Sequence, residues 1–278
     1  MCSIFGIGFY QGHNLNSETM VTGLVSRLFR EAEVGGRRAS GLSIMRERTA
    51  HVLRRAQPAS ELVRDDDYLD FMEDHLSDMD DPNKSNKVMS IIGHCRLNTQ
   101  GSPSNNLNNH PQVIGDIIGI HNGHIRNNHE LFDAFGKVIT RKAEVDTEII
   151  FQLINHFSKP SLAKTIAAIQ KSTPYLQGGY ACGMQNAKHP YNLYLFRHSN
   201  PVRIRYYPKL GAVIFATREH FIDKSLEDFI DSPGNFEEIV LIENRGVVFN
   251  LWNRTMCKFS FKDSAWAEKQ KRGEINAG

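Results

Sequence analysis

The distribution of strand-like segments most constrains the fold of this chain. Apolar, β-branched runs predict strands near residues 2–9, 41–54 (in two pieces), 88–96 and 112–121, and a second set near residues 179–185, 191–197, 202–207, 212–217, 237–242, 246–251 and 255–261. Helical spacing lies between the two sets, in DTEIIFQLINHF (residues 146–157) and SLAKTIAAIQK (residues 161–171). Two strand-rich halves with helices between them predict two sheets, with helices packed against them.

Two further segments have helical character. In SETMVTGLVSRLFREAE, Met20, Leu24 and Leu28 recur at helical spacing, and Ser17 is placed to cap the amino end. The stretch from 60 to 87 contains DDDYLDFMEDHLSDMDDPNKSNK, which predicts an acidic surface helix followed by a loop. Acidic clusters can bind hard cations, but these acids lack the glycine-punctuated spacing of a calcium loop, which favours a solvated helix face.

Composition excludes several classes of protein. The chain has 278 residues, 40% hydrophobic and 23% charged, which is typical of a soluble globular protein with one large domain or two small ones. A net charge of +2 is too small to indicate a nucleic-acid or membrane partner. The locally basic stretch Arg46, Arg48, Arg54 and Arg55 is interpreted as a solvated strand edge. With no membrane-length apolar run and no signal-peptide pattern, we expect a cytoplasmic protein.

The four cysteines, at positions 2, 95, 182 and 257, show no C-x-x-C pair and no spacing typical of a disulfide framework. We therefore expect reduced thiols. Cys182 and Cys257 lie in apolar, strand-like surroundings, which predicts inert packing residues.

Cys2 differs from the other three cysteines because it directly follows the initiator methionine. Removal of Met1 would leave Cys2 with a thiol and a free α-amine on one residue, and an amine with a pKa of about 7.7 to 8.0 can serve as a general base. This is a nucleophile with its own base. The alternative is a buried strand residue, since the apolar run MCSIFGIGF continues after it.

Chemistry-bearing residues concentrate in GHCRLNTQGSPSNNLNNHPQVIGDIIGIHNGHIRNNHELF, residues 93–132. A strand ends at Arg96, a loop rich in Gly, Ser, Pro and Asn follows, and a second strand ends at Asn122 and Gly123. At a tight turn, the Asn122 amide and the Gly123 N–H would form an oxyanion hole, although Asn-Gly is also an ordinary hairpin turn. Arg96 suits a carboxylate or a surface ion pair. Asp146 suits an ammonium group or a helix cap.

Four histidines of this region, His110, His121, His124 and His129, raise the question of a metal site. No cysteine or carboxylate falls at an interval that would complete a ligand set, and the asparagine-rich surroundings favour turns and hydrogen bonds. We therefore expect no metal and no cofactor.

Five features follow one another along the chain: Cys2 with its apolar strand, GHCRLNTQG, NNHP, HNGHIRNNHELF and DTE. In this order they resemble the glutaminase domain of class II glutamine amidotransferases, which are Ntn (N-terminal nucleophile) hydrolases. The resemblance is strongest to the glutaminase half of glucosamine-6-phosphate synthases. It spans roughly residues 2–220, with ATREHF at 216–221 as a weak later echo. It implies an α+β fold, a four-layer αββα sandwich of two antiparallel sheets.

The resemblance also implies the roles of single residues. Cys2 would be the nucleophile, and its α-amine would relay the proton. Asn122 and the Gly123 amide would hold the oxyanion. The other implied residues bind glutamine: Arg96 its α-carboxylate, Asp146 its α-ammonium group, and Thr99 and Gln100 on a loop that closes over it.

Four residues depart from the family pattern. Gly35 stands where the family has an arginine and Arg38 where it has an aspartate, so a supporting ionic contact is lost; Leu97 and Gln100 replace the tryptophan and histidine of the sugar-phosphate enzymes. Length is a further departure, because residues 2–262 are expected to form the glutaminase domain and residues 263–278 only a charged tail or docking strip.

These observations lead to one main hypothesis and two alternatives. The main hypothesis is a stand-alone glutaminase that converts glutamine to glutamate and ammonia, with a separate synthase subunit as partner and acceptor. The first alternative is an amidohydrolase for another γ-glutamyl amide. The second is a catalytically silent binding or regulatory module with the same fold.

Overall fold

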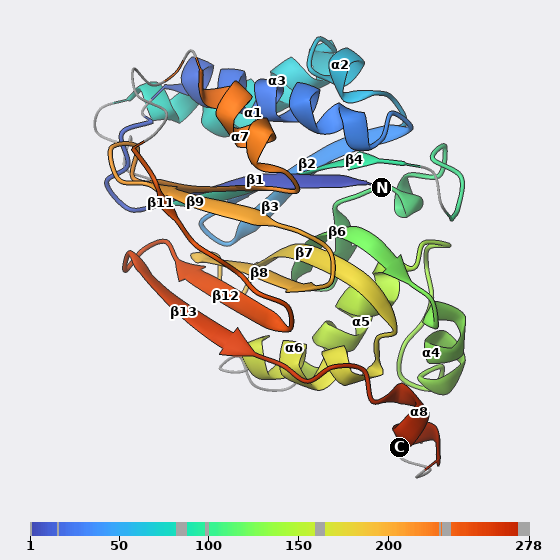
Figure 1. Ribbon diagram of the computed structural model, residues 1–278. Coiled ribbons are helices and arrows are strands. Elements are labelled where there is room, and N and C mark those ends of the chain that lie inside the picture. Colours follow the sequence, from blue (N-terminus) through green and yellow to red (C-terminus); the bar gives the residue numbers. More distant parts are fainter. Residues whose placement is uncertain are drawn as a thin grey trace.

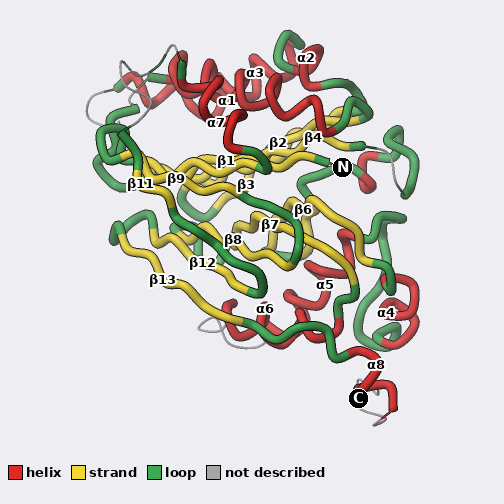
Figure 2. The backbone as a smooth tube through the Cα atoms, viewed as in Figure 1, coloured by secondary structure: helices red, strands yellow, loops and turns green. Residues whose placement is uncertain are grey.

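The computed structural model describes residues 2–15, 17–81, 88–97, 100–158, 165–227, 229 and 235–271. Two sheets lie face to face, and each is covered on its outer side by helices (Figures 1 and 2). All neighbouring strands within each sheet are antiparallel. The α+β fold with a four-layer αββα sandwich is therefore confirmed.

Among the described residues, the first sheet has the strand order β11-β9-β10-β1-β4-β2-β3. Its strands are β1 (Ser3–Phe9), β2 (Ala39–Arg46), β3 (Thr49–Arg55), β4 (Met89–Arg96), β9 (Arg203–Tyr207), β10 (Ala212–Ala216) and β11 (Glu237–Glu238). The second sheet has the order β13-β12-β8-β7-β6-β5. Its strands are β5 (Gln112–Ile114), β6 (Ile117–Ile125), β7 (Gly178–Asn186), β8 (Asn192–His198), β12 (Arg245–Asn250) and β13 (Thr255–Ser260).

The helices form the two outer layers (Figure 1). Those over the first sheet are α1 (Glu18–Ala32), α2 (Ala59–Leu62), α3 (Asp66–Leu76) and α7 (Glu219–Leu226), with the 3-10 turns η1 (Glu33–Gly35) and η2 (Ser77–Asp80). Those below the second sheet and at its end are α4 (Asn128–Ala134), α5 (Thr147–Ser158), α6 (Thr165–Ser172), η5 (Thr173–Tyr175) and α8 (Trp266–Lys271); η3 (Asn106–Asn108) follows β4. Every described helix is too short or too polar to cross a bilayer.

Strand β1 is buried on both faces, and its alternation separates two cores. Phe5 and Ile7 point to the core beneath α1, whereas Ile4 points to the core between the sheets. Side chains of a strand alternate between its faces. Position 2 therefore belongs to the same face as Ile4, which looks toward the second sheet.

A buried polar contact joins the two sheets. Gln185 of β7 accepts a hydrogen bond from Ser43 Oγ of β2 at 2.8 Å, and its Nε2 donates to the Ser90 carbonyl of β4 at 2.8 Å. Because buried polar groups need specific partners, these bonds favour one alignment of the sheets.

Several predicted elements differ in detail. The single strand predicted at 112–121 is a hairpin of β5 and β6, because Gly115 takes a positive φ of 59° and reverses the chain. The strand predicted at 237–242 is only β11, and residues 161–164 of the predicted helix at 161–171 lie outside the described residues. Ser17 occupies the N-cap of α1 but its side chain makes no capping hydrogen bond.

The acidic and basic segments noted in the sequence pair with each other. Arg46 lies 2.6 Å from Asp78, and Arg55 lies 2.5 Å from Asp67 in α3. As predicted, β3 is an edge strand. The basic stretch is thus partly neutralised by the acidic helix, which argues against either as a separate binding site.

All four cysteines are free thiols, as expected. Cys182 is buried, but Cys257 is exposed, so the prediction that Cys257 is a packing residue was wrong. The reason is that β13 is the edge strand of its sheet, where one apolar-looking face remains in solvent.

Residues 263–271 are the described part of the segment assigned to a C-terminal tail. Trp266 is buried, and its Nε1 donates to Glu130 Oε2 at 2.8 Å. The Ala265 N–H donates to the Pro174 carbonyl at 2.8 Å. This part of the segment packs on α4 and η5.

Candidate active site

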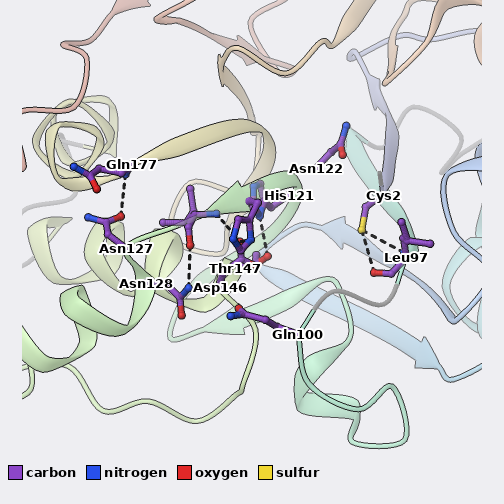
Figure 3. Close-up of polar contacts among 12 residues, drawn as sticks. Cys2, Leu97, Gln100, His121, Asn122, Asn127, Asn128, Asp146, Thr147 and Gln177 are labelled. Carbon is purple, nitrogen blue, oxygen red and sulfur yellow. Dashed lines mark hydrogen bonds and ion pairs between the residues drawn. The ribbon is translucent and has the colours of Figure 1, made fainter.

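Cys2 lies at the amino end of β1, and its sulfur contacts the residue that follows the neighbouring strand β4. The Leu97 N–H donates to Cys2 Sγ at 3.3 Å, and Sγ lies 3.6 Å from the Leu97 carbonyl (Figure 3). Burial raises the thiol pKa, whereas the Leu97 amide and Arg96 lower it and Asp146 raises it. The sulfur is therefore a desolvated thiol beside a backbone donor.

Asn122 comes from the opposite sheet. It lies on β6, at the same side-chain parity as Ile118 and Ile120, which pack between the sheets, and β6 contacts β1 and β4. Its amide is fully buried, and neither Nδ2 nor Oδ1 has a hydrogen-bond partner among the described residues. Figure 3 draws this amide and the Cys2 side chain on the same side of the close-up.

Asn122 and Gly123 do not form a turn. They pair with Ala181 and Tyr180 of β7, and β6 continues to Ile125. The prediction that this pair sits in a tight turn at a strand end was therefore wrong, and so was the hairpin alternative. The β6–β7 pairing explains the error, since it extends through both residues. Gly123 has φ 154°, and a β-carbon there would lie 2.0 Å from the Gly179 carbonyl oxygen.

Asn200 fixes the backbone at this point. Its Nδ2 donates to the Asn122 carbonyl at 2.9 Å. No feature of the sequence around residue 200 pointed to this contact, because it depends on the loop after β8 reaching β6.

Arg96 is a buried arginine of β4, so the surface ion-pair alternative was wrong. Its Nη1 donates to Asn109 Oδ1 at 2.9 Å, and its Nη2 donates to the carbonyls of Gln100 and Gly101. Burial lowers the pKa of Arg96, while Cys2 and Asp146 raise it. Three of its five N–H groups are thus bonded to described residues, and two remain for another acceptor.

The predicted glutamine loop is described in part. Gln100 is held through its carbonyl by Arg96, and its Oε1 is buried without a partner among the described residues. Thr99 lies outside the described residues.

Asp146 precedes α5 but bonds to β6. Its Oδ2 accepts from the Ile125 N–H at 2.6 Å and lies 3.3 Å from His124 Nδ1. The cap alternative therefore gains no support from the described hydrogen bonds. Oδ1 has no hydrogen bond to a described residue, so one carboxylate oxygen is available to a ligand.

The two residues after Asp146 also make specific bonds. Thr147 Oγ1 lies 2.9 Å from His121 Nδ1, and the buried Glu148 accepts from the N–H groups of Lys142 and Ala143 at 2.8 and 2.6 Å. All three residues of DTE thus fix neighbouring backbone or side chains around the site.

Three histidines of the same part of the fold are buried: His94 in β4, His110 before β5 and His121 in β6. The rings of His94 and His110 are 4.0 Å apart, and burial lowers the pKa of His94 to about 3 and that of His110 well below its ordinary value. Burial also lowers the pKa of His121. His124 pairs with Asp146, and His129 Nδ1 lies 3.0 Å from Arg141. Within the described ranges, no group of three or more His, Cys, Asp or Glu side chains is arranged to hold a metal.

The segment that departs from the family pattern has its own ion pair. Glu33 is largely buried, lies 3.0 Å from Arg37 Nε, and accepts from the Ser60 N–H. Arg38 is exposed, and its N–H donates to the Arg96 carbonyl at 3.0 Å. A backbone contact therefore links this segment to β4 in place of the expected side-chain pair.

No protein-family model matches the chain. Glutamine–fructose-6-phosphate aminotransferase (isomerizing) of Staphylococcus aureus is 29% identical over 204 residues, which cover 73% of this chain and 30% of that protein. The Acinetobacter baylyi enzyme of the same name is 36% identical over 116 residues, covering 41% of this chain and 18% of that protein. The chain thus spans about 30% of the length of the curated relatives it matches.

Solved structures share the fold at low sequence identity. The glutamine phosphoribosylpyrophosphate amidotransferase of B. subtilis, complexed with ADP and GMP, aligns with a TM-score of 0.65 and 17% identity over 94% of this chain and 49% of that chain. A structure described as the allosteric regulatory enzyme of purine biosynthesis aligns with a TM-score of 0.66 and 16% identity, with the same coverage of both chains.

Proposed function

The chain is a homologue of the N-terminal part of glutamine–fructose-6-phosphate aminotransferases with the class II glutamine amidotransferase (Ntn-hydrolase) fold, and from this premise we propose that it hydrolyses the side-chain amide of glutamine. Cys2 is the proposed nucleophile, exposed as the terminal residue by removal of Met1. Asn122 and Gly123 are the proposed oxyanion hole.

One observation carries this proposal. The Asn122 amide lies on β6, which contacts strand β1 behind Cys2, and it is buried without a partner among the described residues. Nearly all buried polar groups in proteins are hydrogen-bonded, so this unpaired amide needs an explanation. A transient oxyanion, present only during the reaction, supplies the missing acceptor for Nδ2.

The chemistry follows ordinary acyl transfer. The Cys2 thiolate attacks the amide carbon of the glutamine side chain, and the carbonyl oxygen becomes an oxyanion that accepts from Asn122 Nδ2 and the Gly123 N–H. The carbon–nitrogen bond then breaks, and ammonia leaves with a proton delivered by the Cys2 α-amine. Water attacks the resulting γ-glutamyl thioester, which releases glutamate and restores the thiol.

Arg96 and Asp146 are proposed to select glutamine through its two charged ends. Arg96 has two N–H groups available for the α-carboxylate, and Asp146 Oδ1 is available for the α-ammonium group. Arg96 lowers and Asp146 raises the pKa of the Cys2 thiol, which supports a pocket shared by these three residues. A substrate without the α-carboxylate or the α-ammonium group would leave the charge of Arg96 or Asp146 unpaired. The free-energy cost of that unpaired charge would discriminate strongly against such a substrate.

We also propose that the ammonia is passed to a separate synthase. The curated relatives motivate this, since their name, glutamine–fructose-6-phosphate aminotransferase, joins glutamine to an acceptor. Glutamine and such an acceptor protein are the proposed partners. Activity on glutamine that rises when the acceptor protein is added would support this part of the proposal, and activity that is independent of every candidate acceptor would contradict it.

Intact mass spectrometry tests the nucleophile. The purified protein is expected to lack Met1 and to gain one adduct from the glutamine analogue diazo-oxo-norleucine, mapped to Cys2, with Cys2→Ala as the control that gains none. Glutamate release from glutamine should be lost in the same variant. A trimmed chain that takes no adduct and releases no glutamate would overturn the proposal. Faster hydrolysis of γ-glutamyl amides with a bulkier leaving amine would show that such an amide, and not glutamine, is the substrate.

A further inference from the structure

The peptide unit between Arg96 and Leu97 is the part of the first sheet that contacts the Cys2 sulfur. The Leu97 N–H donates to Sγ at 3.3 Å (Figure 3). An N–H donor stabilises a thiolate relative to a thiol, and this contact opposes the effect of burial on the pKa of Cys2. The position of this one peptide therefore affects how much reactive thiolate the protein holds.

Gly36, which follows η1, lies directly against that peptide. A β-carbon on Gly36 would be 2.1 Å from the Arg96 carbonyl carbon, 2.2 Å from the Leu97 nitrogen and 2.4 Å from the Arg96 oxygen. All three are backbone atoms, which cannot rotate away as a side chain can. Gly36 has φ 169° and ψ 140°, an extended backbone open to any residue, so the position requires space and not a special conformation.

The contact is fixed from both sides. The Gly36 N–H donates to the Glu33 carbonyl at 2.9 Å, and the Arg38 N–H donates to the Arg96 carbonyl at 3.0 Å. On the other side, β4 pairs along its length with β1 and β2. A side chain at position 36 would therefore push the Arg96–Leu97 peptide, at the free end of β4, away from the segment that carries residue 36.

We propose that Gly36 is a positioning residue for the nucleophile, because its missing side chain lets the Leu97 N–H lie where it donates to Cys2 Sγ. The inference rests on the proposed role of Cys2, but its test does not require glutamine. Of the charged side chains that act on the sulfur, Arg96 favours the thiolate and Asp146 opposes it.

Alkylation by iodoacetamide measures the thiolate directly. The rate at Cys2 is followed by peptide mass spectrometry from pH 6 to 10 in the full, Met1-trimmed chain. Gly36→Ala should slow alkylation of Cys2 about tenfold at pH 7 and move its pH profile upward, since a hydrogen bond to a charged group is lost. Cys257, which is exposed on β13, is the internal reference whose rate should not change.

Gly246→Ala is the matched control. Its β-carbon would lie 2.1 Å from the ring of Phe259, so this substitution also creates a close contact, but on β12 and against a side chain. It should leave the Cys2 profile unchanged. An equal slowing in Gly246→Ala would attribute the effect to general destabilisation and overturn the positioning role.

A second pair of variants tests the donor itself. Leu97→Pro removes the N–H, and Leu97→Ala keeps it; the side chain is 42% exposed and the preceding residue is extended, which suits both substitutions. Leu97→Pro should slow alkylation as Gly36→Ala does, and Leu97→Ala should not. Wild-type alkylation in Leu97→Pro would overturn the proposal, whether or not Gly36→Ala folds. If the wild-type protein did not hydrolyse glutamine but the variants still showed these changes in alkylation rate, the proposed function would be contradicted and the positioning role of Gly36 would not.

Discussion

The Asn122 side chain costs the folded protein stability, because its amide is buried without a hydrogen-bond partner among the described residues. A buried polar group in that state costs about 1–3 kcal/mol. Residues that break a rule of stability are expected mainly at functional sites. The proposed oxyanion role gives Asn122 such a reason.

Asn122→Ala should separate the two effects. We expect kcat for glutamine hydrolysis to fall by about 10²–10³, as for the loss of one oxyanion donor, while the free energy of unfolding stays constant or rises. Steady-state kinetics and urea denaturation measure the two quantities. A variant that loses stability but keeps kcat would show that Asn122 is structural.

Asp146 combines a structural bond with a proposed binding role, and two variants distinguish them. Asp146→Asn retains an oxygen for the Ile125 N–H and loses the charge, so KM for glutamine should rise at least tenfold with little change in stability. Asp146→Ala should in addition lower the free energy of unfolding by about 1–3 kcal/mol, because that N–H loses its acceptor. An unchanged KM in Asp146→Asn would refute contact with the substrate ammonium.

At the level of elements, the start of α5 organises the loop before it. Glu148 accepts from two backbone N–H groups, at Lys142 and Ala143, and from Gln152 Nε2 at 3.0 Å. A buried carboxylate with several donors holds the loop from 140 to 144 against the helix. That loop also contacts η3, since the Glu144 N–H donates to Asn108 Oδ1 at 2.8 Å.

Glu148→Ala should release this loop. Two backbone N–H groups lose their acceptor, and we expect the free energy of unfolding to fall by about 3 kcal/mol. Amide hydrogen exchange at Ala143 should become faster. The control is Glu73→Ala on the exposed face of α3, which should change stability by less than about 0.5 kcal/mol. Equal losses in the two variants would contradict the anchoring role.

For the whole molecule, the buried histidines predict a pH dependence of stability. Burial lowers the pKa of His94 from 6.5 to about 3, with smaller contributions from His121 and Arg96. The unfolded chain therefore binds a proton that the folded chain does not between these pH values. The stability from neutral His94 is complete above pH 6.5 and is lost as the pH falls toward about 3.

Urea denaturation between pH 7.5 and 4.5 measures this effect. Below pH 6.5, His94 alone should lower the free energy of unfolding by about 1.4 kcal/mol per pH unit, and His110 should add to the slope. Replacing His94 with Gln should reduce the slope by one proton. A slope that is the same in the two proteins would contradict a buried neutral His94.

Much of the fold could be predicted from local patterns. The β1 run SIFGIGF and the α1 pattern each place apolar residues at one clear period, so local sequence and tertiary burial agree. Prediction failed where an element depends on its neighbours. The residues IGD at 114–116 are typical of a strand interior, yet the chain turns at Gly115. The sequence of β13 is partly apolar, yet β13 is an exposed edge strand of its sheet. The burial of Trp266 likewise depends on α4, more than a hundred residues away.

The sequence by itself determined which residues are proposed to carry the chemistry, because residue type and spacing are local properties. They are Cys2 behind Met1, and Arg96, Asn122–Gly123 and Asp146 in their order. Only the tertiary structure decided how they act together. Strand alternation and sheet stacking bring Cys2 of one sheet toward Asn122 of the other, and the space left by Gly36 sets the donor to the sulfur. Distances between residues far apart in sequence arise from packing, which no local pattern specifies.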